Sequence, residues 1–412
     1  MNEQLIALAD WRWQGHHPNY FVSYAVGMAE AGYRVLPLCP DPGDFSRRLA
    51  LALTDKDESK VGEFIEEPLK LNHPRPSRIR PARYRSWHNA WRRFGELGQR
   101  LRNWESSHAG KVQMVFFACI YDHDFEHFRK VEKRFGFSWS GLYLHARSFR
   151  MPNSPMPYTG VIPRPEKIFT SKLMCSAAVL DEGAVEPMRQ IAGEKPIVWM
   201  PDFTDEYLPK PSEEASGLAR KVTSFAQGRP VVSLMGHLQR TKGLGDFTAA
   251  IEAESLGDVF FFLGGEVNWG EIADAKRQKM QEVWGRAGNV YPHLQYIPDT
   301  EINAVMNVSD AIFAAYRDFP NSSNILTKAA VFKKPIIVSD GYVMAERVRE
   351  YGLGEVVTEG DVGGIVAALK RMLGEGYAEE MQSRARWEDY QSLHSADQLP
   401  QCFKKLLGQE DC

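Results

Sequence analysis

The chain has 412 residues, more than the roughly 100 to 200 of a typical domain, so its length predicts two domains. Hydrophobic residues make up 43% and charged residues 25%, which excludes a globally disordered chain. The net charge of -3 points to no particular class of partner, and no run approaches the roughly 18 apolar residues of a membrane span.

The cysteines indicate the cellular compartment. Five are present, odd in number and never in a C-x-x-C pair, so neither a disulfide framework nor a zinc site is indicated. The first residues, MNEQLIALADW, lack the basic and apolar regions of a secretion signal. We therefore expect a cytoplasmic protein that is not integral to a membrane.

Strand-sized apolar runs alternate with amphipathic stretches along the chain. The first half has such runs at 5–9, 33–39, 112–120, 141–145, 167–171, 176–180 and 195–200. The second half has them at 229–236, 258–265, 294–297, 310–316, 334–339 and 354–357. Apolar strands that alternate with helices predict parallel sheets covered on both faces. Two such series predict an α/β protein with two Rossmann-like, doubly wound domains.

The segment PDFTDEYLPKPSEEAS, from Pro201 to Ser216, has the prolines and acidic residues of a linker. We place an N-terminal domain at 1–203 and a C-terminal domain at 204–390. The remaining segment, 391–412, is expected to form a C-terminal helix. It is a candidate to pack back on the N-terminal domain, although the sequence allows either one.

A basic glycine-containing loop follows the strand VVSLM. It carries Gly236, His237, Arg240, Lys242 and Gly243 before the next helix. Ligands of doubly wound sheets bind beyond the carboxyl ends of strands, where glycines allow close backbone approach and a helix start offers free N–H groups. The loop therefore predicts a phosphate site; the alternative is a solvated basic turn.

A second polar loop follows the strand DAIFAAY. Ser322, Ser323 and Asn324 supply capping side chains and exposed N–H groups at a helix start, and Lys328 lies one turn further on. Simple capping by either serine is the alternative. Both loops fall after strands of the same predicted domain, so one diphosphate would contact both.

The second half resembles the family 4-like glycosyltransferases (group 1) of the GT-B fold. The family's G-R-L-x-x-x-K-G corresponds to GHLQRTKG, 236–243, and its G-K-P-V-I-x-S-D to KKPIIVSD, 333–340. Ser309-Asp310, Glu346 and the stretch DVGGIVAAL also match in order and spacing. The resemblance implies two Rossmann-like domains facing across a cleft, with a nucleotide-sugar donor held by the second.

The chain departs from the family at the donor site. His237 replaces the arginine of G-R-L, whereas Lys242 matches. The family's E-x(7)-E pair falls at Pro320 and Lys328, neither of which is an acid. The second glutamate usually holds ribose hydroxyls, so Lys328 either loses that contact or replaces it with a phosphate contact.

The resemblance also implies a catalytic arrangement. It implies retention of anomeric configuration, with Asp318 as the nearest acid that would serve the missing carboxylate's role. The strand GLYLH ends at His145, which resembles the family's histidine that faces the transferred sugar. A buried structural histidine is the alternative. Lys242, Arg240 and the N–H groups of 322–324 would stabilise the leaving diphosphate without a metal or cofactor.

The first half resembles the family more loosely. LADWRWQGHHPNYF resembles the glycine-containing first loop, with Gly15 on the donor and His16 and His17 on the acceptor or phosphate. The alternative is a surface turn before a helix.

A basic stretch, 75–102, holds nine arginines and one acid. Trp87 and Trp91 belong to an apolar stripe at helical spacing, and Arg92 and Arg93 lie beside it. Such a helix can lie on an anionic membrane surface, which suits a lipid-linked acceptor. The alternative is that the stripe packs on the domain core. Binding to nucleic acid is disfavoured by the acidic balance.

The stretch DHDFEH, 122–127, has the D-x-D spacing of a metal site. We interpret it as a helix cap and an exposed first turn, because it lies far in sequence from the donor loops. No metal is therefore expected.

These patterns together predict a hexosyltransferase type of enzyme. It would move a sugar from a nucleotide sugar to a glycan or lipid-linked acceptor, in bacterial-type surface polysaccharide or glycolipid assembly. It would work in the cytoplasm or on the inner membrane face. A degenerate GT-B module without transfer activity and a GT-B-fold sugar-nucleotide epimerase are the alternatives.

Overall fold

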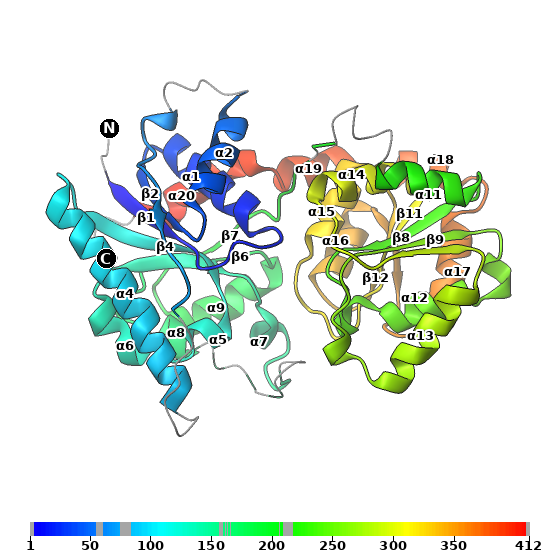
Figure 1. Ribbon diagram of the computed structural model, residues 1–412, viewed down its shortest axis with the longest axis horizontal. Helices are drawn as coiled ribbons and strands as arrows, with labels where there is room; N and C mark the ends of the chain where they lie inside the picture. The colour runs from blue at the N-terminus through cyan, green and yellow to red at the C-terminus, as the bar shows by residue number, and fades with distance from the viewer. Residues whose placement is uncertain are drawn as a thin grey trace. The chain divides into compact units, whose positions relative to one another are not determined.

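The computed structural model describes residues 4–54, 61–74, 84–155, 160, 162, 164, 166–205, 207–208 and 217–408 (Figure 1). The side chains of Asp122 and His123 are not described. The chain forms two compact units. The first consists of Met1–Pro201 with Ala396–Cys412, and the second of Asp202–Ser395.

The first unit is built on a seven-stranded parallel sheet in the order β3-β2-β1-β4-β5-β6-β7. Its strands are β1 (Leu5–Ala9), β2 (Arg34–Cys39), β3 (Leu69–Lys70), β4 (Val112–Ile120), β5 (Trp139–Tyr143), β6 (Ala177–Val179) and β7 (Ile197–Trp199). The central strands are mainly apolar, and all of β1 is buried. A strand that is buried along its whole length needs cover on both faces.

Helices supply that cover. They are α1 (His17–Glu30), α2 (Pro42–Leu53), α4 (Arg85–Ser107), α5 (Asp122–Phe125), α6 (Phe128–Phe135), α7 (Arg147–Arg150), α8 (Glu166–Phe169), α9 (Val185–Ala192) and α20 (Leu399–Leu407). In Figure 1, α1, α2 and α20 lie on one face of the sheet, and α4, α6, α8 and α9 on the other. The chain's final helix α20 packs on α1, where the rings of Phe403 and Tyr24 are 5.8 Å apart.

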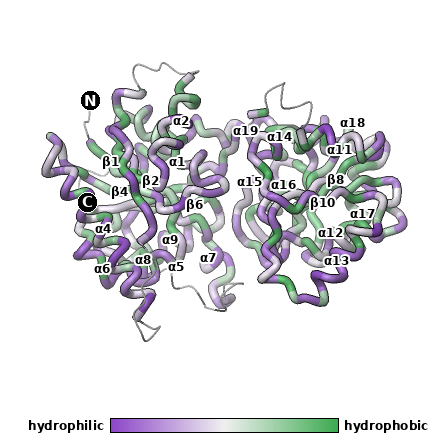
Figure 2. Tube along the Cα trace, in the orientation of Figure 1, coloured by the Kyte–Doolittle hydropathy of each residue, from purple (hydrophilic) through white to green (hydrophobic). Residues whose placement is uncertain are grey.

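The second unit has a six-stranded parallel sheet in the order β10-β9-β8-β11-β12-β13. Its strands are β8 (Val231–Met235), β9 (Phe260–Gly264), β10 (Val290–His293), β11 (Ala311–Ala314), β12 (Ile336–Ser339) and β13 (Gly354–Val357). Figure 2 shows hydrophobic segments inside both units. Two doubly wound α/β units are thus confirmed.

The helices of the second unit begin with α11 (Leu218–Ala226), α12 (Leu244–Ile251), α13 (Asp274–Arg286) and α14 (Asp299–Val308). They continue with α15 (Asn324–Val331), α16 (Val343–Tyr351), α17 (Val362–Met372), α18 (Tyr377–Arg384) and α19 (Trp387–Leu393). Figure 1 shows α12 and α13 on the face of the sheet opposite α11 and α14.

The strand order reverses once in each sheet. In the first unit β1 pairs with both β2 and β4, and in the second β8 pairs with both β9 and β11. Loops that leave such a pair of strands diverge to opposite faces and open a crevice for ligands. The loops after β1, β4, β8 and β11 are therefore the places to look for chemistry.

Two predicted strands are wrong. Residues 167–171 include the end of helix α8, and 294–297 form a loop after β10, because short apolar runs also fit buried helices and turns. Cys39, Cys119 and Cys402 are buried free thiols. Cys175 takes part in a disulfide, which the widely spaced cysteines did not indicate. Within the described residues, no helix combines the length and apolarity needed to cross a membrane.

Candidate functional site

The loop after β8 approaches the end of β11 closely. It forms one 3-10 turn, Arg240–Lys242, and then passes through Gly243 into α12. Gly243 has a φ of 69°, and a Cβ there would lie 2.3 Å from the carbonyl oxygen of Ala315. Only glycine combines this backbone conformation with so close an approach. The glycine that sequence reasoning assigned to phosphate binding thus brings the two loops together.

Lys242 joins the two loops chemically. Its Nζ lies 3.5 Å from Ser323 Oγ and 4.0 Å from the centre of the Tyr316 ring. Among the described residues, no carboxylate lies within ion-pair distance of Lys242. A cation held by a hydroxyl and an aromatic face, without a counter-ion, attracts an anion.

Arg240 and Asp318 are tied to each other. Their side chains form an ion pair of 3.3 Å, and both are partly exposed. The N–H of Asp318 donates to Glu359 Oε2 at 3.0 Å, and its φ of 51° is unusual for a residue other than glycine. His237 is exposed on the same loop. Asp318 therefore lies beside the basic loop, and its carboxylate already has a cationic partner.

The polar residues at the start of α15 have different roles. Ser322 Oγ donates to Asp202 Oδ2 at 2.5 Å and accepts from Arg347, while Asn324 Nδ2 donates to the carbonyl of Phe203 at 2.7 Å. These two side chains anchor the start of α15 to the segment that contains Asp202 and Phe203. Ser323 occupies the N-cap position without a capping bond from its side chain. Of the three, Ser323 is therefore the one beside the basic loop.

Lys328 points elsewhere. It is 5% exposed, and its Nζ donates to Asn303 Oδ1 at 2.7 Å. Asn303 in turn donates to Asp205 Oδ1 at 3.0 Å. Burial lowers the pKa of Lys328. The ammonium of Lys328 thus links α15 to α14 through Asn303. The predicted contact with a phosphate finds no support in this geometry.

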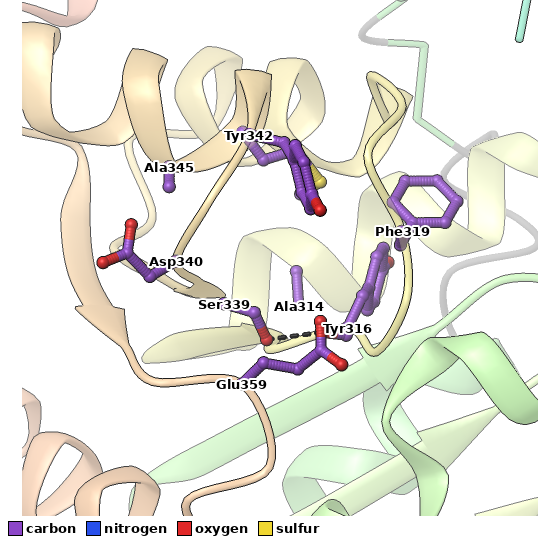
Figure 3. Close-up of a pocket in the computed structure, with 9 residues that line it drawn as sticks. Ala314, Tyr316, Phe319, Ser339, Asp340, Tyr342, Ala345 and Glu359 are labelled. Atoms are coloured by element: carbon purple, nitrogen blue, oxygen red, sulfur yellow. Dashed lines mark hydrogen bonds between the residues drawn. The ribbon is translucent and has the colours of Figure 1, made fainter. Parts of the chain in front are cut away.

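A small aromatic pocket lies beside these loops, at the carboxyl ends of β11 and β12 (Figure 3). Tyr316 and Phe319 border it on one side and Tyr342 on another, while Ser339 and Glu359 lie next to Tyr316. Tyr316 is 2% exposed, and its Oη has no hydrogen-bond partner within the described part of the chain. A buried unpaired hydroxyl costs free energy unless a ligand satisfies it. Sequence reasoning missed this pocket, although Tyr316 and Phe319 were visible in and beside the polar loop.

In the first unit a hydrogen-bonded relay follows β1 and β4. The Nδ1 of His17 lies 2.8 Å from Asp10 Oδ2, and its Nε2 lies 3.0 Å from the hydroxyl of Tyr121. All three residues are buried. A carboxylate on one ring nitrogen fixes the tautomer and orientation of the histidine, as in catalytic dyads. His17 was expected in contact with an acceptor, and its two buried partners were not foreseen.

Charged and aromatic groups surround this relay. Arg12 lies over the Tyr121 ring at 4.2 Å and pairs with Asp124, which also pairs with Arg93. The His145 ring meets that of Tyr121 edge-on at 5.2 Å. Burial raises the pKa of Tyr121, so its phenol stays protonated. His145 follows the end of β5 by two residues instead of ending the strand as predicted, and it belongs to the same cluster as His17.

Gly15 and His16 lie at the entrance to α1. His16 is exposed and stacks on the His17 ring at 5.0 Å. Gly15 immediately precedes it with a φ of 60°. The expected first loop therefore presents one exposed and one buried histidine.

Asp10, His17 and Cys119 come within 4.8 Å of one another, a spacing that would suit a metal ion. Asp10 and His17 are already bonded to each other, and burial raises the pKa of Cys119 well above its usual value. In this structure Asp10 and His17 are therefore engaged with each other, and His17 also with Tyr121.

The D-x-D stretch starts helix α5, as interpreted from the sequence, but the prediction of an exposed first turn is wrong for Asp124 and Phe125, which are buried. Asp124 is engaged by Arg12 and Arg93, and His127 Nε2 bonds to Ser86 at 2.9 Å. These contacts hold α4 against the start of α5.

Helix α4 packs its apolar stripe inward. Phe94, Leu97, Leu101 and Trp104 are buried against the sheet and α6. The guanidinium of Arg134 covers the ring of Trp91 at 3.8 Å. Arg93 forms an ion pair with Asp124. Trp87 is 37% exposed and Arg92 is partly exposed. Most of the stripe therefore serves the core.

Comparisons with solved structures place this arrangement among known folds. No protein-family model and no curated protein matches the chain. HepE from Anabaena, in complex with UDP and glucose, has a TM-score of 0.64 and 13% identity, covering 99% of this chain and 100% of its own. The chain has the GT-B fold.

Two further GT-B structures cover the chain as fully. An E. coli structure, described as trehalose-6-phosphate bound with UDP-2-fluoro glucose, has a TM-score of 0.67 at 12% identity, covering 99% of this chain and 100% of its own. Sucrose-phosphate synthase from Thermosynechococcus elongatus has a TM-score of 0.60 at 17% identity, covering 98% and 100%. The resemblance to GT-B glycosyltransferases is thus confirmed at the level of the fold.

Proposed function

We propose that this protein is a glycosyltransferase that moves a hexosyl group from a nucleotide sugar to a glycan or a lipid-linked acceptor. The observation that carries the proposal is Lys242. It lies at the point where the strand order of the second sheet reverses, between Ser323 Oγ and the Tyr316 ring, and without a counter-ion among the described residues. An anion at this point would meet a cation and the free N–H groups at the start of α15.

A nucleoside diphosphate suits this site. Lys242 and the backbone N–H groups at Ser323 and Asn324 would stabilise the charge that develops on the leaving diphosphate, with Arg240 beside them. These donors can act without a metal or a cofactor. Because the similar HepE and E. coli structures hold UDP or a UDP-sugar, a uridine nucleotide is the first donor to test.

The first unit would supply the acceptor side of the reaction. His17, oriented by Asp10 and linked to Tyr121, would accept or relay the proton of an acceptor hydroxyl. His145, against the Tyr121 ring, would position the sugar, and the exposed His16 would contact the acceptor. The proposed reaction retains the anomeric configuration of the sugar, and Asp318, which pairs with Arg240, would serve the role of the missing carboxylate.

The pathway and location also belong to the proposal. We place the activity on the cytoplasmic face of a membrane, in surface polysaccharide or glycolipid assembly. The exposed Trp87 and the neighbouring Arg92 on α4 would contact anionic lipid. Co-sedimentation with anionic vesicles that is unchanged by Trp87→Ser would contradict this contact.

Calorimetric titration with UDP and UDP-glucose tests the function. We expect wild-type binding in the micromolar range and a loss of about tenfold in affinity, or roughly 1.4 kcal/mol, in Lys242→Ala. The matched control is Lys279→Ala, which removes an exposed lysine from α13. Transfer or hydrolysis of the bound sugar nucleotide would then show catalysis.

A module that binds a nucleotide sugar without transfer is the second candidate. It is favoured by one observation: the two positions where the resembling family has glutamates hold Pro320 and the buried Lys328. Tight UDP-sugar binding without turnover, in the presence of a broad panel of acceptors, would support this candidate over the enzyme.

A further inference from the structure

The aromatic pocket beside the proposed donor loops is too small for a nucleobase or a whole sugar. It has a volume of about 10 Å3, which is space for about one water-sized group. It lies where β11 and β12 end, at the edge of a doubly wound sheet that usually receives ligands (Figure 3). The occupant that fits is therefore a single substituent of a larger ligand.

The pocket shares two aromatic rings with the proposed phosphate site. The Nζ of Lys242 lies 4.0 Å from the centre of the Tyr316 ring and 5.2 Å from that of Phe319, and both aromatic residues line the pocket. In a nucleotide sugar the phosphate is joined to C1 of the hexose, so the substituent on C2 lies close to the phosphate. A donor with its diphosphate at Lys242 would bring that substituent to the pocket.

Apolar side chains make up much of the pocket wall. Ala314, Met344 and Ala345 are each no more than 5% exposed, and the ring of Phe319 adds a further apolar surface. A hydroxyl group in such surroundings loses its bonds to water. A methyl group instead gains free energy by leaving water, and the flexible methionine side chain can pack against it. The wall therefore favours a substituent with an apolar end.

One buried polar atom of the pocket has no partner. Tyr316 is 2% exposed, and its Oη makes no hydrogen bond within the described part of the chain. Ser339 Oγ, by contrast, donates to the carbonyl oxygen of Tyr316. A buried hydroxyl without a partner costs free energy, which an acceptor on a ligand would offset. The substituent therefore needs a hydrogen-bond acceptor as well as an apolar end.

The charged residues of the pocket disfavour an acidic substituent. Asp340 and Glu359 line the pocket, and its lining includes no lysine or arginine among the described residues. The carboxylate of Asp340 is already paired with Arg349 at 2.6 Å. An acid placed here would meet two carboxylates and no cation of the lining. A neutral group with an acceptor and a methyl end avoids that repulsion.

We infer that the pocket takes the acetamido group of an N-acetylhexosamine, so that the donor is a nucleoside diphosphate N-acetylhexosamine. The methyl group would lie against Met344 and Ala345, and the carbonyl oxygen would accept from Tyr316 Oη. The C2 hydroxyl of glucose is shorter and has no methyl group, so it would leave the pocket unfilled. This inference rests on the proposed function and names the class of sugar for the same site.

Calorimetric titration with UDP, UDP-glucose and UDP-N-acetylglucosamine tests the inference. The wild-type protein should bind the N-acetylated donor about tenfold more tightly than UDP-glucose, because a buried hydrogen bond and a buried methyl group each contribute a factor of a few. Tyr316→Phe removes only the hydroxyl and should reduce this preference to about threefold. The matched control is Tyr377→Phe on α18, outside the pocket lining, which should keep the preference within about twofold of the wild-type value.

A second variant fills the pocket instead of removing its donor. Ala345→Val adds two methyl groups on α16, in the space that the acetamido methyl would occupy. UDP-N-acetylglucosamine should then bind no more tightly than UDP-glucose. The matched control is Ala367→Val at an exposed position of α17, which should keep the wild-type preference. A single cooperative melting transition shows that each variant is folded.

The inference is overturned if the wild-type protein binds UDP-glucose as tightly as UDP-N-acetylglucosamine, or more tightly. It is also overturned if the full preference survives in both Tyr316→Phe and Ala345→Val. In either case, binding of UDP to the wild-type protein would still support the proposed function. If none of the three nucleotides binds, the proposed function fails and the inference fails with it.

Discussion

Lys242 and Ser323 lie 81 positions apart in the chain, yet Lys242 Nζ is 3.5 Å from Ser323 Oγ. The contact links the loops that leave β8 and β11, the neighbouring strands at which the sheet order reverses. The centre of the Tyr316 ring lies 4.0 Å from the same ammonium, so the ring face also contacts Lys242. A cationic site made from two separate loops depends on how closely those loops approach.

Gly243→Ala tests that approach. The new Cβ would lie 2.3 Å from the Ala315 carbonyl, at a φ of 69°, so the loops must separate. We expect a loss of about 2 kcal/mol in the free energy of unfolding, together with weaker UDP binding. The control is Gly285→Ala in α13, where a Cβ meets nothing within 4 Å. That change should stabilise the protein by up to about 1 kcal/mol in urea unfolding.

Tyr316→Phe tests whether the buried hydroxyl awaits a ligand. Without ligand the variant should be more stable by about 1 kcal/mol, because an unpaired buried hydroxyl is removed. Its affinity for UDP or UDP-glucose should fall several-fold if the hydroxyl donates to the donor. Tyr377→Phe is the control, since its hydroxyl is 2.9 Å from Glu355 Oε1 and its removal should destabilise. A loss of stability in Tyr316→Phe would show that the hydroxyl already has a partner.

Asp10→Asn tests the relay in the first unit. The amide cannot hold the His17 ring as the carboxylate does, so transfer should slow by about a hundredfold or more. UDP affinity should stay within about twofold, because the proposed donor site lies in the other unit. Asp41→Asn is the control, as asparagine caps α2 as well as aspartate does. Equal rates for the two variants would remove Asp10 from the mechanism.

His394 should make the protein sensitive to acid. It is 2% exposed, and burial lowers its pKa from 6.5 to about 2. Between these values the unfolded state binds the proton and the folded state does not, so stability falls as the pH drops below 6.5. The slope contributed by His394 is at most about 1.4 kcal/mol per pH unit.

His394→Gln removes this titration while keeping an acceptor for the N–H of Asp202, which lies 3.2 Å from His394 Nδ1. Urea unfolding at a series of pH values should therefore show a stability difference between wild type and variant that shrinks or reverses in acid. Parallel profiles from pH 6.5 downward would mean that His394 is protonated in the folded state.

Two substitutions on α4 separate packing from surface contact. Phe94 is fully buried, with its ring 4.5 Å from that of Phe128, so Phe94→Ala should cost about 3 to 5 kcal/mol of unfolding free energy. Trp87 is 37% exposed, so Trp87→Ala should change stability by no more than about 0.5 kcal/mol. A large loss in Trp87→Ala would assign that end of the helix to the core.

Much of the fold was readable from the sequence, and the failures are specific. Long apolar runs such as 112–120 form central strands, because a long apolar run between helices is best buried in the middle of a sheet. The runs at 167–171 and 294–297 did not, because short apolar segments pack equally well as helix or loop. The position of α20 on α1 was one of two options that composition could not separate.

The site was readable in its loops but not in its contacts. Spacing alone indicated that Lys242 and Ser323 follow strands of one sheet, and parallel strands bring such loops to one edge. It did not indicate that Lys328, one turn further along the same helix, faces Asn303 instead. The position of a residue in a helix determines on which face its side chain lies. The groups that this face contacts come from segments distant in sequence.

The amino-acid sequence by itself determined two doubly wound α/β units and the polar loops that end their strands, because local hydrophobic period and glycine placement act within a few residues. Only the tertiary structure decided which polar groups are satisfied. It gave Asp318, Ser322 and Lys328 protein partners, linked His17 to Asp10 and Tyr121, and left Lys242 without a carboxylate within ion-pair distance in the described chain. Pairing depends on distances between segments far apart in sequence, which no local pattern encodes.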